Sequence, residues 1–75
     1  MGGKYLSLIG KGARSEVEAS AKEHGIPFQY VTSICPNEIM GRAPVEFVDK
    51  AREWFHRDTH ETRPGSLLFW SVIEE

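Results

Sequence analysis

The chain has 75 residues, of which 40% are hydrophobic, and 9 basic against 11 acidic side chains leave a net charge of −2. This length allows one domain with a small core, and the hydrophobic content excludes a disordered chain. The charge lacks the basic excess of a sequence-independent nucleic-acid binder, and no apolar run approaches the ~20 residues of a membrane span. Because the N-terminus also lacks a signal-peptide core, we expect a single cytoplasmic domain over residues 1–75, with neither nucleic acid nor membrane as a partner.

Domains of this size often depend on disulfides, a metal or a second subunit for stability. The single cysteine, Cys35, excludes an intramolecular disulfide and suits a reducing compartment. His56 and His60 would share a helix face only in a helix that reached His60, and no other histidine or cysteine lies near them to complete a metal shell. We therefore expect no metal and no cofactor, and we expect oligomerisation or partner binding to supplement the core.

The first predicted elements are a strand and a helix. Residues 5–9 are apolar and bounded by glycines, which is typical of a short strand. Ser15 begins a Ser-x-x-Glu capping box, which predicts a helix with Ser15 as its N-cap. Gly25 suits the left-handed position after a helix and Pro27 cannot continue one, so we expect the helix to end near His24.

A second strand and a second helix are predicted next. Residues 28–35 alternate between two faces, and Pro36-Asn37-Glu38 is expected to end this strand. Residues 39–43 are interpreted as a loop, and Pro44 is well placed at the first position of the second helix. Apolar residues then recur at spacings of three and four, as in an amphipathic helix: Phe47, Val48, Ala51, Trp54 and Phe55.

The last predicted element is a third strand, reached through a polar connector over residues 56–66. Residues 67–73 are apolar on both faces, as expected for a strand covered from both sides or by another subunit. The order β-α-β-α-β predicts a small α/β domain with two helices and a three-stranded, mostly parallel sheet. Strand order 2-1-3 would place the helices on opposite faces, order 3-2-1 would leave one face bare, and the long connector also permits an antiparallel third strand.

The turn after the first strand is the main candidate for a ligand site. Glycines let the backbone approach a ligand, and amides at a helix start attract anions. Arg42 is expected to join the site, because ligands of open α/β sheets bind beyond the carboxyl ends of the strands. The turn is neither a Walker A loop nor a complete dinucleotide fingerprint, and a purely structural turn is the alternative. The predicted anion site consists of Gly10, Lys11, Gly12, Arg14, Ser15 and Arg42.

Aromatic side chains provide the second candidate site. Two tryptophans and two phenylalanines are difficult to bury completely in so small a chain, which makes a partner interface an alternative to core packing. The residues expected at this interface are Trp54, Phe55, Phe69 and Trp70.

The expected function is that of a small non-catalytic interaction protein. No nucleophile–base pair or acid–base pair can be assigned, so an enzyme is the least favoured class. We expect a regulator or inhibitor that contacts itself and another protein; phage-encoded and plasmid-encoded accessory factors are often of this kind. The alternative is a binder of a nucleotide or other phosphorylated compound at the Gly10–Ser15 turn.

Overall fold

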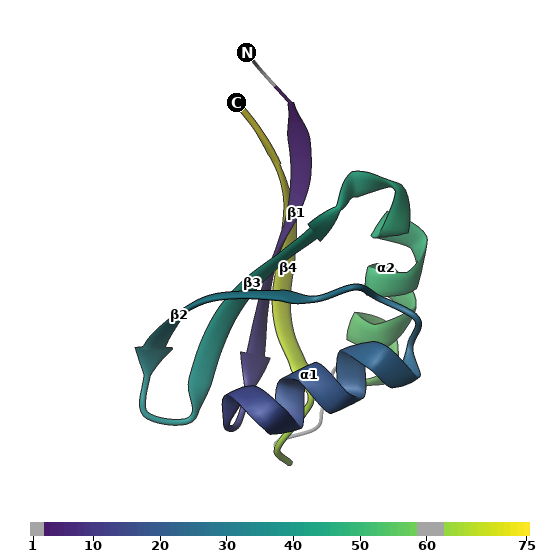
Figure 1. The fold of residues 1–75 in the computed structure, drawn as a ribbon. Helices are drawn as coiled ribbons and strands as arrows, with labels where there is room; N and C mark the ends of the chain where they lie inside the picture. The colour runs from purple at the N-terminus through teal and green to yellow at the C-terminus, as the bar shows by residue number, and fades with distance from the viewer. Residues whose placement is uncertain (1–2, 59–62) are drawn as a thin grey trace.

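A computed structural model describes residues 3–58 and 63–75 of the chain. Its elements are β1 (Lys4–Lys11), α1 (Arg14–Glu23), β2 (Gln29–Cys35), β3 (Glu38–Pro44), the 3-10 helix η1 (Val45–Phe47), α2 (Val48–Arg57) and β4 (Leu67–Glu74) (Figure 1). The strands form one sheet in the order β2-β3-β1-β4, and neighbouring strands are antiparallel throughout. This is the ferredoxin-like βαββαβ arrangement, in which β3 separates the two strands of the first βαβ unit.

The predicted three-stranded, mostly parallel sheet is therefore wrong. Residues 38–44 form a strand instead of a loop, because Pro36 and Asn37 make a hairpin turn and do not end the sheet. Asn37 has a positive φ of 70°, a conformation that asparagine tolerates, and proline suits the preceding turn position. Strands joined by so short a turn are antiparallel, and β3 occupies the place beside β1 that a parallel strand would have filled.

The start of α1 also differs from the prediction. The N-cap residue is Ala13, and its backbone N–H donates to Oε1 of Glu16 at 2.7 Å. Ser15 is thus the second helical residue and not the N-cap. The Ser-x-x-Glu spacing was misleading because a different glutamate caps the helix. Glu16, three residues after Ala13, accepts the backbone N–H of Ala13, and no hydroxyl side chain caps the helix.

The end of α1 confirms the prediction. His24 is the C-cap residue, and Gly25 follows it with a φ of 73°. The N–H of Gly25 donates to the carbonyl of Lys22 at 3.0 Å, and the N–H of Ile26 donates to that of Ala21 at 2.9 Å. This pair of hydrogen bonds is a Schellman motif, which requires the left-handed backbone that glycine adopts without strain.

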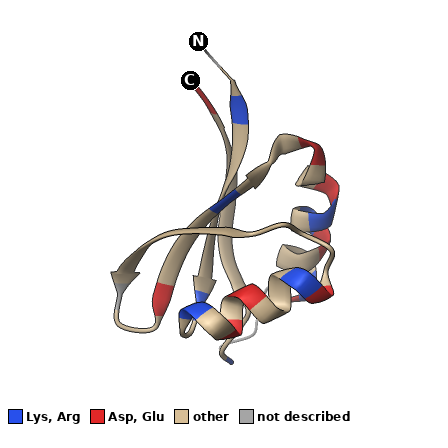
Figure 2. Ribbon diagram, viewed as in Figure 1, with Lys and Arg blue, Asp and Glu red and all other residues tan. Residues whose placement is uncertain are grey.

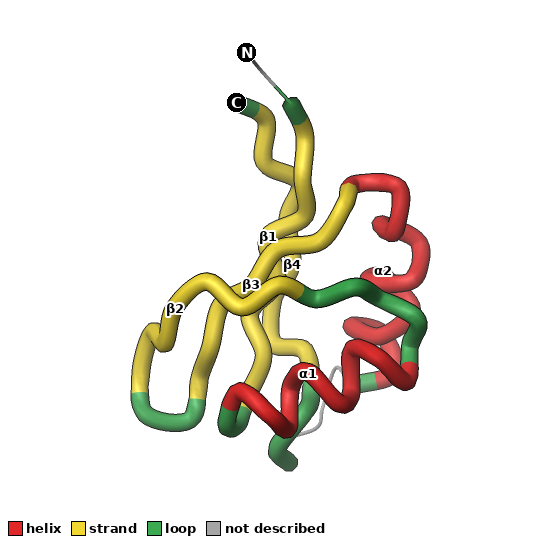
Figure 3. The backbone as a smooth tube through the Cα atoms, viewed as in Figure 1, coloured by secondary structure: helices red, strands yellow, loops and turns green. Residues whose placement is uncertain are grey.

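Both helices pack on one face of the sheet and leave the other face uncovered (Figure 3). Alternate positions of β1 point toward the helices, so Leu6 and Leu8 are fully buried. A bare face was expected for strand order 3-2-1, but the three predicted strands, β1, β2 and β4, lie in the order 2-1-3, with β3 inserted between the second and the first. The core on the covered side consists of Leu6, Leu8, Val17, Ala21, Ile26, Ile39, Ala43, Ala51, Trp54 and Leu67.

The second half of the chain partly follows the predictions. The apolar stripe of α2 is confirmed, since Ala51 and Trp54 are buried against the sheet. Pro44 does not begin this helix; it ends β3, and η1 separates it from Val48, where α2 starts. β4 pairs with β1 in the antiparallel direction. In the described part of the chain, no helix has the length and apolar character needed to cross a membrane.

Candidate functional site

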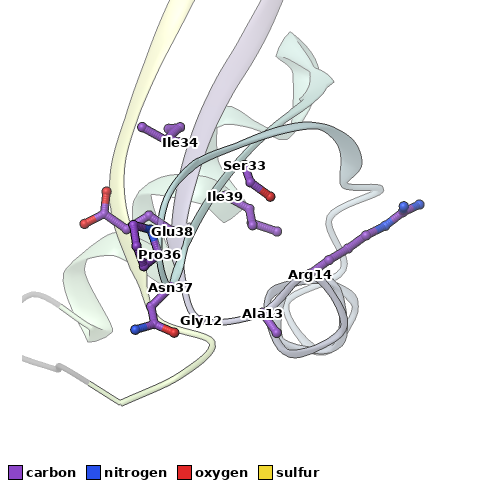
Figure 4. A pocket seen from close by; sticks show the side chains of 9 residues that line it. All are labelled: Gly12, Ala13, Arg14, Ser33, Ile34, Pro36, Asn37, Glu38 and Ile39. Atoms are coloured by element: carbon purple, nitrogen blue, oxygen red, sulfur yellow. The ribbon is translucent and has the colours of Figure 1, made fainter.

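A cavity of about 570 Å³ lies beside the start of α1, between that helix and the β2–β3 hairpin (Figure 4). The backbone N–H of Gly12 donates to the carbonyl of Asn37 at 2.6 Å, which ties the turn after β1 to the hairpin turn. Gly12 has a φ of 110°, a conformation that favours glycine. The lining includes Gly12, Ala13, Arg14, Ser33, Asn37 and Ile39.

Arg14 contributes its backbone to this cavity, whereas its side chain extends away from it (Figure 4). The Nε atom donates to Oε2 of Glu18 at 3.0 Å, and the guanidinium lies 4.4 Å from the ring centroid of Tyr30. An arginine held by a carboxylate and an aromatic ring is partly neutralised. The positive charge of Arg14 therefore already interacts with Glu18 and Tyr30 in the absence of a ligand.

The helix start beside the cavity also has an internal anion. The carboxylate of Glu16 accepts the N–H of Ala13, so it occupies the position at which a bound anion would meet the free amides. Ser15 is exposed on the first turn of the helix. A ligand with negative charge at this turn would have to displace or tolerate the Glu16 carboxylate.

Gly10 and Lys11 are integrated into the packing of the sheet. A Cβ atom on Gly10 would lie 2.6 Å from Cγ1 of Val17, so the absence of a side chain lets α1 pack closely on β1. Lys11 is half-buried, and its backbone N–H donates to the carbonyl of Ser66 at 2.9 Å. Gly10 therefore has a structural reason to be glycine that involves no ligand.

The structure does not bring Arg42 to the turn. Arg42 pairs with Ser7 across β1 and β3, and its guanidinium lies 4.6 Å from the ring centroid of Tyr5. It is four residues along β3 from Glu38, the partner of Lys11, which is about 13 Å in a strand. The six residues of the predicted anion site thus separate into a turn and a distant arginine on the sheet.

The four aromatic residues predicted at an interface do not form one surface. Trp54 is fully buried and stacks on His24 with ring centroids 5.4 Å apart, and Phe55 is half-buried against the core. Phe69 is 52% exposed and lies on the sheet face opposite the helices. Trp70 points to the covered side, where the guanidinium of Arg52 lies 5.9 Å from its ring centroid.

The uncovered side of the sheet, here called the open face, carries a group of residues that sequence reasoning missed. Ile9 pairs with Met40 on β3 and with Phe69 on β4, so these three side chains form a row across three adjacent strands. Charged residues lie mainly on the helices and near the strand ends (Figure 2). The signal in the sequence was the alternation Tyr5-x-Ser7-x-Ile9, which becomes informative only once both helices are known to lie on the other side.

A metal site receives no support from the described residues. His56 belongs to α2, and His60 lies outside the described residues. Within residues 3–58 and 63–75, no group of three or more His, Cys, Asp and Glu residues could hold a metal ion. Compared with known proteins, the sequence matches no family model and no curated protein.

Proposed function

We propose that this protein is a small non-catalytic interaction protein, a regulator or inhibitor that binds another protein through the open face of its sheet. The observation that carries the proposal is the row of Ile9, Met40 and Phe69 across three adjacent strands, over which neither helix of the described residues lies. Contiguous apolar side chains on an otherwise charged small domain favour burial against a partner. The single free cysteine favours the cytoplasm as its compartment.

The surroundings of this row have the composition of an interface. Tyr5 and Arg42 stack on each other at one side of the row, and tyrosine and arginine are enriched where proteins meet. Beside them is a second cavity of about 280 Å³, which Pro27 and Pro44 also line. A hollow of this size beside an apolar row could accept one side chain of a partner.

The proposed action is binding and not catalysis because of what the open face presents. Acid–base and nucleophilic catalysis need a base held against the reacting group. At the row itself, the open face presents the apolar side chains of Ile9, Met40 and Phe69, and the guanidinium of Arg42 beside it is stacked on a ring. Such groups provide contact area and orientation for a partner.

Site-specific photo-crosslinking in cells of the source organism tests this proposal. A photoreactive amino acid replaces Met40, which is half-buried on the open face, or Glu53, which is exposed on α2 as a matched control. The Met40 position should give a discrete adduct with another protein that the Glu53 position does not give. Adding the substitution Ile9→Glu should remove this adduct without unfolding the domain. Equal labelling from both positions, or no adduct from Met40, would refute an open-face interface.

The cavity beside Gly12 favours a second candidate function, which is binding of a nucleotide or other phosphorylated compound at the Gly10–Ser15 turn. The cavity adjoins the start of α1, and the side chains of Ser33 and Asn37 add polar groups to its lining. The Glu16 carboxylate opposes a strongly charged ligand there, so affinity in the millimolar range is the most that we expect. Nuclear magnetic resonance titration with inorganic phosphate and with nucleotides tests this candidate.

A further inference from the structure

The two edges of the sheet differ in their readiness to accept another strand. The register of β2 against β3 shifts twice, after Tyr30 and again after Ser33. Such irregularities twist an edge strand away from any new neighbour. β4 forms the other edge, and its register against β1 is regular from Phe69 to Glu74. Apart from one register shift, between Leu67 and Phe69, the β4 edge therefore keeps the regular backbone that strand addition needs.

The sequence of β4 also lacks the residues that usually protect an edge. Proteins commonly place lysine, proline or an inward-pointing charge on an exposed edge strand. β4 contains no proline, and its first charged residue is Glu74, at its end (Figure 2). An uncharged edge of this kind invites pairing with another strand.

The hydrogen bonds at the end of the sheet show which backbone groups of β4 point away from β1. Gly3 and Glu75 exchange both of their N–H···O bonds, at 3.1 and 2.9 Å. Hydrogen-bonded and non-hydrogen-bonded pairs alternate along an antiparallel ladder, so Ser71 bonds to β1 as well. The backbone N–H and C=O groups of Trp70 and Val72, on either side of Ser71, consequently point to the free edge.

The exposed hydrophobic side chains of β4 lie on both sides of the sheet. Phe69 is 52% exposed and Val72 is 45% exposed. Because they are three residues apart in a strand, they point to opposite faces. A partner lying on either face would cover one of them, whereas a strand added at the edge would flank both. Edge pairing is therefore the arrangement that places a second strand beside both side chains.

We propose that two copies of this chain join through their β4 edges, in an antiparallel register centred on Ser71. In this register Trp70 of one copy exchanges both backbone hydrogen bonds with Val72 of the other, and the symmetric pair doubles this to four. Phe69 then lies beside Ile73 of the second copy on the open face. The same centre aligns residues 68–74 of the two β4 strands with each other, and the two sheets become one continuous sheet. This edge adjoins the open face of the proposed function and shares Phe69 with it.

Disulfide trapping tests the register directly. The two Ser71 residues form a non-hydrogen-bonded pair with Cα atoms about 4.5 Å apart, within the range that a disulfide spans. In a Cys35→Ser background, Ser71→Cys should therefore form a covalent dimer under mild oxidation. Ile73→Cys is the matched control on the same face, because the two copies of residue 73 would be about 14 Å apart. Equal cross-linking of the two variants, or none from Ser71→Cys, would overturn the proposed register.

Sedimentation equilibrium of the intact protein, from micromolar to several hundred micromolar, tests the pairing without a cross-link. The wild type should reach twice the 8.5 kDa mass of one chain. Val72→Pro should weaken dimerisation by roughly 30-fold or more, because each copy loses one outward N–H while the bonds to β1 remain. Val72→Thr, which keeps that N–H and the branched shape, should remain dimeric.

A further variant guards against a failure of Val72→Pro to fold. Val72→Lys keeps the whole backbone ladder and introduces the edge charge that β4 lacks, so it should also be monomeric. Circular dichroism establishes that each variant is folded. A wild type that stays monomeric throughout, or a dimer indifferent to both Val72→Pro and Val72→Lys, would overturn the proposal. The open-face test at Met40 is independent of either result.

Discussion

Replacing Gly10 with alanine tests whether this residue serves a ligand or the packing of α1. The new Cβ atom would lie 2.6 and 2.8 Å from the two Cγ atoms of Val17, well inside van der Waals contact. Overpacking a tight core typically costs 1–3 kcal/mol, and we expect about 2 kcal/mol for Gly10→Ala. A domain of this length has a total stability of roughly 4–11 kcal/mol, so the variant should remain folded. The loss corresponds to a fall in Tm of roughly 8–16 °C.

Urea denaturation and thermal melting followed by circular dichroism measure this loss, with Gly3→Ala as the control because no atom lies within 4 Å of its Cβ position. Val17→Ala removes the two clashing methyl groups, so Gly10→Ala should cost little in the Val17→Ala background. The double-mutant cycle should then show a coupling of about 1–2 kcal/mol. A cost below about 0.5 kcal/mol for Gly10→Ala, or additive effects in the cycle, would refute the close packing of β1 and α1.

Three further outcomes can be measured on the same material. Ser15→Ala should change the free energy of unfolding by less than about 0.5 kcal/mol, whereas Glu16→Ala should lower it by about 1 kcal/mol because Ala13 loses its capping acceptor; the opposite order would restore Ser15 as the cap. Gly25→Ala should cost about 1 kcal/mol in a chemical melt, since alanine disfavours the left-handed backbone, and an unchanged midpoint would contradict the Schellman end of α1. Phosphate or nucleotide at millimolar concentration should shift the amide resonances of residues 12–16 if the second candidate function holds, and Ser33→Ala, which removes a hydroxyl from the cavity lining, should weaken the shifts; unshifted resonances in the wild type would leave the turn purely structural.

Local sequence signals predicted those parts of the fold that local chemistry determines. Gly25 marked the end of α1 because the residue after the C-cap has a left-handed backbone, which glycine adopts without strain. The stripe containing Ala51 and Trp54 marked α2 because both residues recur on one helical face. The apolar run from Leu67 marked β4 without determining its partner.

β3 could not be predicted in the same way, because it contains a glycine that only a contact with a distant part of the chain explains. Gly41 interrupts the pattern of a strand, yet a Cβ atom there would overlap the ring of Phe28. Met40 and Arg42, on either side, have no strong preference for a strand. The need for glycine at this position becomes visible only when the chain before β2 is placed over the sheet.

The candidate site shows the same limit. Trp54 fits both the predicted helix stripe and the predicted aromatic interface, and its complete burial in the structure places it in the core. Arg42 seemed to belong with the glycine turn because a parallel sheet would have gathered the loops at one edge. In the antiparallel sheet, Arg42 lies within β3 and not in a loop, and its guanidinium stacks on the ring of Tyr5. One missed strand therefore changed the neighbours of most candidate residues.

The central position of β1 has a consequence for how the protein is made. Leu6 and Leu8 are synthesised before either neighbouring strand exists, and Leu6 finds its partners only at Ala43 and Val72. Sheets with such sequence-distant pairings fold slowly for their size. Until β4 has been synthesised, β1 keeps an unpaired edge in the growing chain, which is when nascent chains of this topology are most prone to aggregate and to recruit chaperones.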